Sequence, residues 1–281
     1  MQRLPDYLKR PIIDTDKTRT VRKILKTKCL NTVCENARCP NKNECYTNNT
    51  ATFLIMGNYC TRNCRYCNIS CNKPEPLDKQ EPEHVAQAIK DLGLEYAVIT
   101  SVTRDDLPDG GASHFSKCIE EIRKISDNIK IEILTPDFKG NKSALDIIIN
   151  AKPDVFNHNI ETVERLFKTA RPQGNYKVSL NVLKYIKENS DIKTKSGLMI
   201  GLGETFEEIE QTLNDLKSVG CNFLTVGQYI QPSKLHLNVS KYYTLDEYEK
   251  LKQLAKSIGF EKYQIGPLVR SSYKSKDVYE A

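Results

Sequence analysis

The sequence predicts an α/β fold, a partial (β/α)6 TIM-like barrel, for two reasons. From Thr52 onward, short apolar runs alternate with amphipathic stretches of helical periodicity, which is typical of parallel βαβ units. No G-x-G-x-x-G pattern follows the first of these runs, so the strongest sequence signal of a doubly wound, dinucleotide-binding sheet is missing. Barrels carry their chemistry on the loops after the carboxyl ends of the strands, so we expect the functional residues on those loops.

The predicted elements follow one another in chain order. Pro82 and Gly93 mark the start and the end of the first helix after Thr52, and Ser113 is expected to cap the second. The predicted strands are 52–57, 96–100, 129–135, 154–160, 195–201 and 222–230. The predicted helices are 81–93, 113–125, 143–151, 163–169, 176–188, 205–219 and 245–258, with further helical potential at 18–28.

Three regions of the chain differ in composition. Residues 1–51 contain few apolar residues and a cysteine-bearing stretch rich in Asn and Pro, so we expect an N-terminal extension that carries a cysteine motif. Residues 52–232 are expected to form the barrel, and residues 233–281 a C-terminal helix and tail. We expect the extension and the tail to close over the barrel mouth.

The overall composition bounds the class of protein. A chain of 281 residues buries a large core without disulfide staples, so its ten cysteines are not needed to hold the fold together. The first residues do not resemble a signal peptide, and no apolar run approaches ~18 residues. The net charge of +6 is scattered along the chain. We therefore expect a soluble, cytoplasmic protein with reduced cysteines, and neither a membrane nor a nucleic acid as its partner.

The cysteines are concentrated in a short span, since seven of the ten lie between Cys34 and Cys71. Cys60, Cys64 and Cys67 form C-x3-C-x2-C on one loop after the first strand. Three thiolates bind three irons of a 4Fe–4S cluster and leave the fourth iron open to a small molecule. The alternative is zinc, which prefers four ligands, and Cys71 would then be the fourth.

This loop, with the aromatic Tyr66 before its last cysteine, resembles the radical S-adenosylmethionine superfamily. The "DGG" of Asp109–Gly111 is similar to the motif that binds the methionine amino group, and "GLMIGLGE" (Gly197–Glu204) is similar to G-x-I-x-G-x-x-E. The resemblance implies that the open iron binds S-adenosylmethionine, which an electron from the cluster cleaves to a 5′-deoxyadenosyl radical. It assigns cofactor contacts to Tyr66, Asp109, Gly110, Gly111 and Glu204.

A second motif, C-x4-C-x5-C at Cys34, Cys39 and Cys45, narrows the resemblance to the lipoyl synthase family. The stretches "TRDDLPDGGA", "DVFNHNIETVERL", "ARPQGNYKVSLNVLK", "GQYIQPS" and "GPLVRSSY" are similar to that family as well. The resemblance implies a second 4Fe–4S cluster on these three cysteines, with Ser272 as its fourth ligand and Ser271 as the alternative. If Ser272 is a ligand, order in the C-terminal tail is expected to depend on metal binding.

The resemblance also implies the reaction and its partners. Two sulfides of the second, sacrificial cluster are inserted at C6 and C8 of a protein-bound octanoyl-lysine, which gives lipoyl-lysine. The substrate is an octanoylated lipoyl carrier domain, either a 2-oxoacid dehydrogenase E2 subunit or the glycine cleavage H protein. An electron donor such as ferredoxin or flavodoxin and an iron–sulfur cluster carrier complete the set of partners.

Some residues allow more than one interpretation. Cys29 lies at the same spacing from Cys34 as Cys34 does from Cys39, so Cys29/Cys34/Cys39 is a competing triad by spacing alone. We expect His158 to be a hydrogen-bonding residue. Cys118 and Cys221 are expected to be buried small residues, and the tyrosines of 241–251 to pack on a helix. Contacts with S-adenosylmethionine or substrate are expected, by family resemblance, from Asn159, Glu161 and Arg171.

Two functions of other classes stay open. One is a related radical enzyme with another substrate, such as a nucleic-acid methylthiotransferase, although no further module follows the last predicted helix. The other is a zinc-binding interaction protein. The metal and labile sulfide content of anaerobically purified protein distinguishes this last function from the first two.

Overall fold

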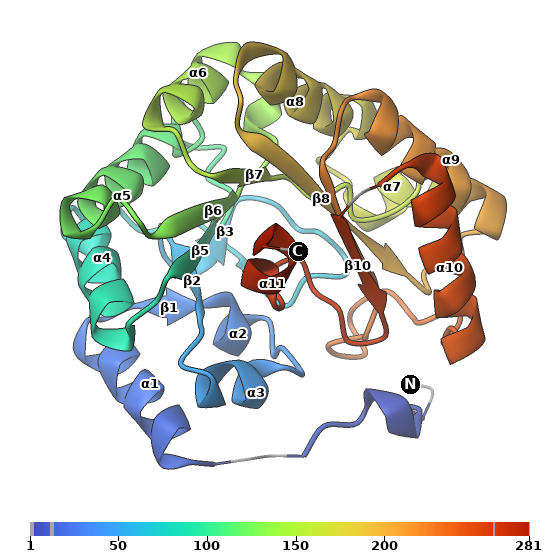
Figure 1. Cartoon of the computed structure of the whole chain (residues 1–281), viewed down its shortest axis with the longest axis horizontal. Coiled ribbons are helices and arrows are strands. Elements are labelled where there is room, and N and C mark those ends of the chain that lie inside the picture. The colour runs from blue at the N-terminus through green and yellow to red at the C-terminus, as the bar shows by residue number, and fades with distance from the viewer. Residues whose placement is uncertain (1–2, 12–13, 261, 281) are drawn as a thin grey trace. The chain divides into compact units, whose positions relative to one another are not determined.

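The structure is a computed structural model that describes residues 3–11, 14–260 and 262–280 (Figure 1). These residues form two compact units. The N-terminal unit consists of Arg10–Arg62 and Asn68–Phe156. The C-terminal unit consists of Met1–Lys9, Asn63–Cys67 and Asn157–Ala281.

The sheet of the N-terminal unit is mostly parallel. Leu54 pairs with Thr100, and Thr100 pairs with Leu134, so three strands run side by side in one direction. The first of them is buried along its whole length, as expected for a parallel strand covered on both faces. The strands are β1 (Asn31–Thr32), antiparallel to β2, then β2 (Thr52–Ile55), β5 (Tyr96–Ser101), β6 (Lys130–Leu134) and β7 (Val155–Asn157) at the unit boundary.

Helices alternate with these strands and line one side of them in Figure 1. The long helices are α1 (Asp16–Thr27), α4 (Glu81–Leu92), α5 (Ala112–Ile125) and α6 (Lys142–Ala151). The short elements are α2 (Val33–Asn36), α3 (Lys42–Thr47), the 3-10 turn Phe138–Gly140 and the small paired strands β3 (Tyr59–Cys60) and β4 (Ser70–Cys71). The connections from β2 to β5 and from β5 to β6, the neighbouring parallel strands, therefore pass through α4 and α5, which is the βαβ pattern.

The C-terminal unit contains a second run of parallel strands. Leu198 pairs with Val226, which pairs with Ile265. In Figure 1, α9 and α10 lie on one side of these strands and α11 on the other. The strands are β8 (Lys193–Ile200), β9 (Phe223–Gln228) and β10 (Lys262–Gly266). The helices are α7 (Glu164–Ala170), α8 (Tyr176–Asn189), α9 (Phe206–Ser218), α10 (Leu245–Ile258) and α11 (Ser275–Glu280), with a 3-10 turn at Asp6–Leu8.

All six predicted strands and all seven predicted helices after Thr52 are present, to within a few residues at their ends. The elements that were not predicted are the strands β1, β3, β4 and β10, the helices α2, α3 and α11, and the 3-10 turns Asp6–Leu8 and Phe138–Gly140. None of the described helices is both long enough and apolar enough to cross a membrane.

The predicted Ser113 cap of α5 is wrong. The helix begins at Ala112, and its N-cap residue is Gly111, which has no side chain to cap with. The Asp109 carboxylate does this work, because it accepts hydrogen bonds from the amides of Gly111 at 3.0 Å and Ser113 at 2.8 Å. The left-handed turn at Gly110 and Gly111, with φ of +61° and +93°, brings the carboxylate back over the helix start.

Candidate functional site

Cys60, the first cysteine of the C-x3-C-x2-C loop, is already positioned by hydrogen bonds in the N-terminal unit. Its Sγ accepts the amides of Arg62 at 3.4 Å and Thr103 at 3.3 Å. Backbone N–H groups directed at a cysteine sulfur are a known lever on iron–sulfur potentials. The surroundings of Cys60 therefore fit a cluster ligand.

A buried charged network stands directly behind this cysteine. Arg62 is 3% exposed in its side chain and pairs with two carboxylates. Its Nε and Nη2 bind Asp105 at 2.7 and 2.9 Å, and its Nη1 and Nη2 bind Asp137 at 2.7 Å each. Burial alone lowers the pKa of Arg62, but the hydrogen bonds and charges of the two aspartates raise it well above its ordinary value. The guanidinium is thus permanently charged and fully paired.

Thr61 connects the same segment to the loop after β5. Its amide and its hydroxyl both donate to the Thr103 carbonyl at 3.0 Å, and its hydroxyl accepts the Asp105 amide at 3.0 Å. Residues 60–62 are therefore held from three sides. Arg62, Asp105 and Asp137 were not among the predicted site residues, although an arginine inside the cysteine loop is visible in the sequence.

The predicted Asp109–Gly111 motif also lies in the N-terminal unit. Burial alone raises the pKa of Asp109, but hydrogen bonds from Ser113 and Gly111 bring it below its ordinary value. A Cβ at Gly111 would collide with the Met56 sulfur, so the backbone passes where a side chain has no room. Both carboxylate oxygens of Asp109 accept hydrogen bonds from backbone amides of the same turn. The motif therefore fixes the conformation of the loop.

Cys34, Cys39 and Cys45 lie on and between α2 and α3. The Cys39 amide donates to the Cys34 carbonyl at 3.1 Å, and burial followed by the neighbouring cysteines raises the pKa of Cys45 to about 12. Burial, followed by Cys39, also raises the pKa of Cys34 to about 12. The thiols are therefore close enough to influence one another, while Cys29 is exposed. Among the described residues, no three potential ligands are already arranged around one metal position.

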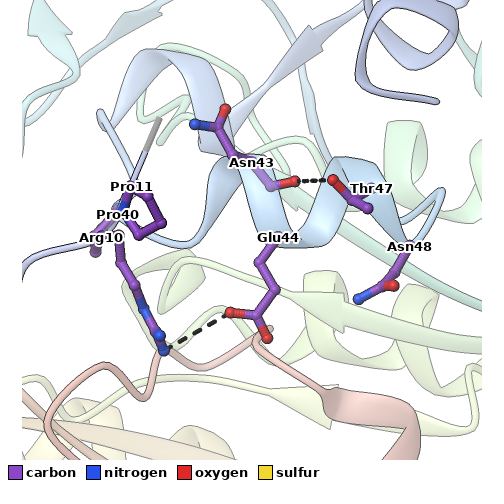
Figure 2. A pocket seen from close by; sticks show the side chains of 7 residues that line it. All are labelled: Arg10, Pro11, Pro40, Asn43, Glu44, Thr47 and Asn48. Atoms are coloured by element: carbon purple, nitrogen blue, oxygen red, sulfur yellow. Dashed lines mark hydrogen bonds and ion pairs between the residues drawn. The ribbon is translucent and has the colours of Figure 1, made fainter. Parts of the chain in front are cut away.

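Helix α3, which carries Cys45, also borders a pocket of about 230 Å³ (Figure 2). Arg10 Nη2 lies 3.7 Å from Glu44 Oε2 across this pocket, and the Thr47 hydroxyl donates to the Asn43 carbonyl at 2.8 Å. Both carboxylate and guanidinium are substantially exposed, so the pair contributes little to stability.

The other two cysteines of the loop, Cys64 and Cys67, belong to the C-terminal unit. The Cys67 amide donates to the Cys64 carbonyl at 3.1 Å, and the Cys67 carbonyl lies 3.0 Å from His236 Nε2. His236 Nδ1 in turn lies 2.8 Å from the Ser233 hydroxyl. The Leu237 amide also donates to the Arg65 carbonyl at 3.0 Å. The loop after β9 therefore holds this segment, a contact that the sequence did not reveal.

Four of the predicted cofactor residues come together in the C-terminal unit. Asn159 Nδ2 donates to Glu161 Oε1 at 3.2 Å, and Arg171 Nη1 donates to the Asn159 carbonyl at 3.2 Å. Burial raises the pKa of Glu161. The charge of Arg171 and hydrogen bonds from Asn159 and Tyr66 lower it, but the net shift is upward. Burial, then Glu161 and the two cysteines, raises the pKa of Tyr66. Tyr66 therefore links the cysteine loop to this polar group.

A pocket of about 100 Å³ adjoins these residues. Its walls come from the loop after β7, from β8 and β9, and from the segment after β10. The lining residues are Asn159, Glu161, Gly197, Leu198, Met199, Thr225, Gly227, Val269, Arg270 and Ser271. The predicted glycine motif on β8 thus meets Asn159 and Glu161 at one polar pocket.

Glu204, predicted from the same glycine motif, is engaged by its own loop. Its carboxylate accepts the amides of Gly201 at 2.6 Å and Leu202 at 2.9 Å, and the Tyr243 hydroxyl at 2.9 Å. Beside it, the fully buried Gln228 donates to the carbonyls of three residues and accepts the amide of Tyr243 at 3.0 Å. Both residues fix the loop after β8. Gln228 lies in the family-like stretch "GQYIQPS", but no role was predicted for it.

The two candidate serines have different surroundings. The Ser271 hydroxyl donates to Asn159 Oδ1 at 2.8 Å. The Ser272 hydroxyl has no hydrogen-bond partner within the described part of the chain and is half-buried. Three other interpretations are confirmed: Cys118 and Cys221 are buried, and His158 Nε2 lies 3.0 Å from the Ser179 hydroxyl. Of the tyrosines of 241–251, Tyr243 and Tyr248 are buried, but Tyr242 is half-buried and only Tyr248 lies on α10.

Comparison with known proteins places this geometry in a family. The model of the radical SAM superfamily matches residues 54–216. The chain is 50% identical over 272 residues to a lipoyl synthase of Caldanaerobacter subterraneus subsp. tengcongensis, covering 96% of this chain and 95% of that protein. It is 51% identical over 280 residues to one of Caldicellulosiruptor bescii, covering 98% and 96%. It is 49% identical over 267 residues to one of Aquifex aeolicus, covering 95% and 97%.

Solved structures share the fold at low sequence identity. The FeFe-hydrogenase maturase HydG from Carboxydothermus hydrogenoformans has a TM-score of 0.60 at 15% identity, with 95% of this chain and 62% of that chain covered. SuiB from Streptococcus suis bound to S-adenosylmethionine has a TM-score of 0.57 at 16% identity, with 80% and 51% covered. This chain thus spans about half the length of SuiB. Together with the family match, these likenesses confirm the predicted fold class.

Proposed function

This chain belongs to the lipoyl synthase family of the radical S-adenosylmethionine superfamily, and we propose that it inserts two sulfur atoms, at C6 and C8, into a protein-bound octanoyl-lysine. The product is lipoyl-lysine, so the enzyme is a sulfurtransferase. The proposal depends mainly on one observation. A chain about half identical to lipoyl synthases over nearly its full length carries both the C-x4-C-x5-C and the C-x3-C-x2-C motif.

The proposal requires two 4Fe–4S clusters and S-adenosylmethionine. When bound, the first cluster and S-adenosylmethionine supply a 5′-deoxyadenosyl radical that removes hydrogen atoms from unreactive carbons, and the second cluster supplies the sulfur. Thiolates are the preferred ligands for such clusters, and the two amides that donate to Cys60 Sγ suit a thiolate. We assign Cys60, Cys64 and Cys67 to the first cluster and Cys34, Cys39 and Cys45 to the second.

The polar residues around the pocket on β8 are assigned to S-adenosylmethionine. Glu161 offers a carboxylate to a cationic ligand, Asn159 an amide, and Arg171 a guanidinium suited to a carboxylate. Tyr66 is assigned with them because its hydroxyl hydrogen-bonds to the Glu161 carboxylate. Asp109, Gly110, Gly111 and Glu204 shape the binding loops, since the two carboxylates already bond to backbone amides.

Ser272 is proposed as the fourth ligand of the second cluster. The Ser271 hydroxyl is engaged by Asn159, whereas the Ser272 hydroxyl lacks a partner among the described residues, which favours Ser272 of the two. A serine oxygen is a harder ligand than thiolate and suits a cluster that is consumed during the reaction.

We propose a cytoplasmic enzyme whose substrate is an octanoylated lipoyl carrier domain, of an E2 subunit or of the H protein. Ferredoxin or flavodoxin would donate electrons, and an iron–sulfur carrier protein would rebuild the second cluster. The names of the relatives support the carrier domain as substrate. Cysteines that serve as cluster ligands must stay reduced, so the two cysteine motifs support a reducing compartment.

Anaerobic turnover of an octanoylated lipoyl-domain peptide with S-adenosylmethionine and a reductant tests the function. Mass spectrometry is expected to detect first one and then two sulfur atoms added to the peptide. A different result is that the enzyme contains iron and labile sulfide and cleaves S-adenosylmethionine but leaves the peptide unmodified. That result would indicate a radical enzyme with another substrate. Zinc without labile sulfide would contradict the radical chemistry altogether.

Substitution of single cysteines assigns the two clusters. Cys60→Ala is expected to abolish cleavage of S-adenosylmethionine, because no radical forms without the open iron. Cys34→Ala should retain cleavage of S-adenosylmethionine but lose sulfur insertion. Cys29→Ala should retain both activities. Equal loss of cleavage in the first two variants, both properly folded, would contradict the division of roles.

A further inference from the structure

Lys195 is a buried lysine that the proposed chemistry does not use. It lies on β8 and is 1% exposed, and its Nζ donates to the Ser275 hydroxyl at 2.8 Å. A lysine side chain is almost never fully buried unless its charge is met by polar groups, because desolvation of the ammonium is costly. Ser275, on α11, supplies one of the polar groups that meet this ammonium.

The same hydroxyl connects Lys195 to the proposed ligand segment. Ser275 Oγ donates to the Ser271 carbonyl at 3.2 Å, and the Ser271 hydroxyl donates to Asn159 at 2.8 Å. Ser272 thus lies between two residues that are fixed to the C-terminal unit. We name residues 267–280 the C-terminal tail.

Two glycines on neighbouring strands make room for this tail. A Cβ on Gly197 would lie 2.6 Å from the Ser271 hydroxyl and 2.7 Å from Asn159 Oδ1. A Cβ on Gly227 would collide with the carbonyl oxygen of Val269, which is backbone and has little freedom to move. Any side chain at Gly227 would therefore displace the tail.

The end of the tail is held as well. The Tyr279 ring packs edge-on against Phe223 of β9 with centroids 6.3 Å apart, and Lys262 Nζ donates to the Tyr279 carbonyl at 2.5 Å. Val278 is buried. From Val269 to Tyr279 the tail therefore lies against β8, β9 and β10 of its own unit. Side chains and backbone of the protein make each of these contacts.

We infer that Lys195 and Ser275 are positioning residues that keep the C-terminal tail docked on β8–β10, so that Ser272 is presented to the second cluster independently of its bond to iron. This inference rests on the proposed function for the role of Ser272, but the docking itself does not. It reverses the sequence-based expectation that metal binding orders the tail. A cluster that is consumed would then find its serine ligand in place when it is rebuilt.

Hydrogen exchange of the reconstituted full-length protein tests the docking. In Lys195→Met, amides of residues 268–280 are expected to exchange about tenfold faster than in the wild type, as follows from losing a hydrogen bond of a charged group. Lys193→Met, an exposed lysine on the same strand, is the matched control and should leave tail exchange unchanged. Ser275→Ala should accelerate exchange in the same segment if Lys195→Met proves poorly folded.

The Ser272→Ala variant separates the inference from the proposed function. Its tail should exchange as slowly as in the wild type, whether or not sulfur insertion is lost. Equal acceleration in Ser272→Ala and Lys195→Met would mean that the iron bond holds the tail, and it would overturn the inference. Slow tail exchange in both Lys195→Met and Ser275→Ala would overturn it too. Failure of Ser272→Ala to affect sulfur insertion would count against the ligand assignment alone.

A spectroscopic measurement tests whether docking positions the ligand. In a Cys60→Ala/Cys64→Ala/Cys67→Ala background only the second cluster is expected to form, and isotopically enriched iron makes its Mössbauer spectrum readable. Lys195→Met should shift part of the spectrum toward that of Ser272→Ala, while Lys193→Met should not. An unshifted spectrum in Lys195→Met would reduce Lys195 to a residue that only stabilises the fold.

Discussion

Two buried polar networks, one in each unit, stand beside functional segments and differ in kind. In the N-terminal unit, the Arg62 guanidinium lies between the carboxylates of Asp105 and Asp137. In the C-terminal unit, the neutral Gln228 side chain lies among backbone carbonyls, with two donors facing its oxygen. The first network depends on charge balance between distant residues, and the second on the donor and acceptor pattern of one amide.

The difference has a physical consequence. Removing one partner of a buried ion pair leaves an uncompensated charge, which costs more than the pair contributed. Substituting a buried amide costs the free energy of the hydrogen bonds that are lost. The cost is larger when the new side chain cannot donate and buried acceptors are left unpaired. We therefore expect the segment behind Cys60 to tolerate no single substitution, and the loop after β8 to tolerate some.

The largest effect is expected from Arg62→Met. It leaves Asp137, which is 2% exposed, buried without its guanidinium, so the free energy of unfolding should fall by about 3–5 kcal/mol. Denaturant titration measures it, with Arg65→Met, an exposed arginine nearby, as the matched control. A loss no larger in Arg62→Met than in the control would remove the contrast between the units.

A smaller effect is expected from Gln228→Glu. The introduced carboxylate accepts but cannot donate to the carbonyls of Ile200, Tyr229 and Lys241, so unfolding should become easier by about 3 kcal/mol at neutral pH. Burial should raise the pKa of the introduced carboxyl. The cost should therefore shrink as the pH falls through that raised value, because the protonated acid donates one hydrogen bond.

Urea titrations at several pH values measure this dependence. Gln253→Glu, at an exposed position of α10, is the control and should change stability little at any pH. A cost in Gln228→Glu that stays constant from neutral to acid pH would indicate that lost packing, rather than the missing donor, explains the change.

The smallest effect is expected from Asp154→Asn, and like the effect of Gln228→Glu it should be largest at neutral pH and shrink in acid, although here the native carboxylate is the titrating group. Burial alone raises the pKa of Asp154, but the Ile131 amide, Arg123 and Lys130 lower it overall. A lowered pKa gives stability that is present above the unfolded value of about 3.9 and is lost as the pH falls through the folded value. The variant should therefore be less stable by about 2 kcal/mol at pH ~7 and equal to the wild type in strong acid.

Asp127→Asn, at an exposed position of the same unit, serves as its control. Thermal unfolding of the three proteins from neutral to acid pH measures the difference. A gap between wild type and Asp154→Asn that survives at the acid end would contradict the assignment to the charged carboxylate.

The regular part of the fold was predictable because its apolar periodicity is strong. The strand at 52–55 is a continuous apolar run, and the helix at 81–92 has both a proline start and a glycine stop. β10 was missed because its sequence, Lys-Tyr-Gln-Ile-Gly, is half polar and only its last two residues are buried. Ser113 was misassigned because the capping carboxylate, Asp109, lies outside the usual cap position.

The candidate site was predictable where the residues are close in sequence. The two cysteine motifs are local patterns, and Tyr66 lies inside one of them. Arg62 was not identified with its partners, because Asp105 and Asp137 are 43 and 75 positions away, and no local pattern joins them. Lys195 and Ser275, 80 positions apart, were missed for the same reason.

The course of the tail over Gly197 and Gly227 bears on the order of events during synthesis. Domains generally form as the chain emerges, N-terminal parts first. The N-terminal unit, whose residues end at Phe156, is complete long before residues 267–280 leave the ribosome. Until the tail is synthesised, Gly197 of β8 and Gly227 of β9 lack the contacts that Ser271 and the Val269 carbonyl make with them in the folded protein. At this stage the C-terminal unit cannot complete its packing, and the nascent chain is then most exposed to chaperone binding.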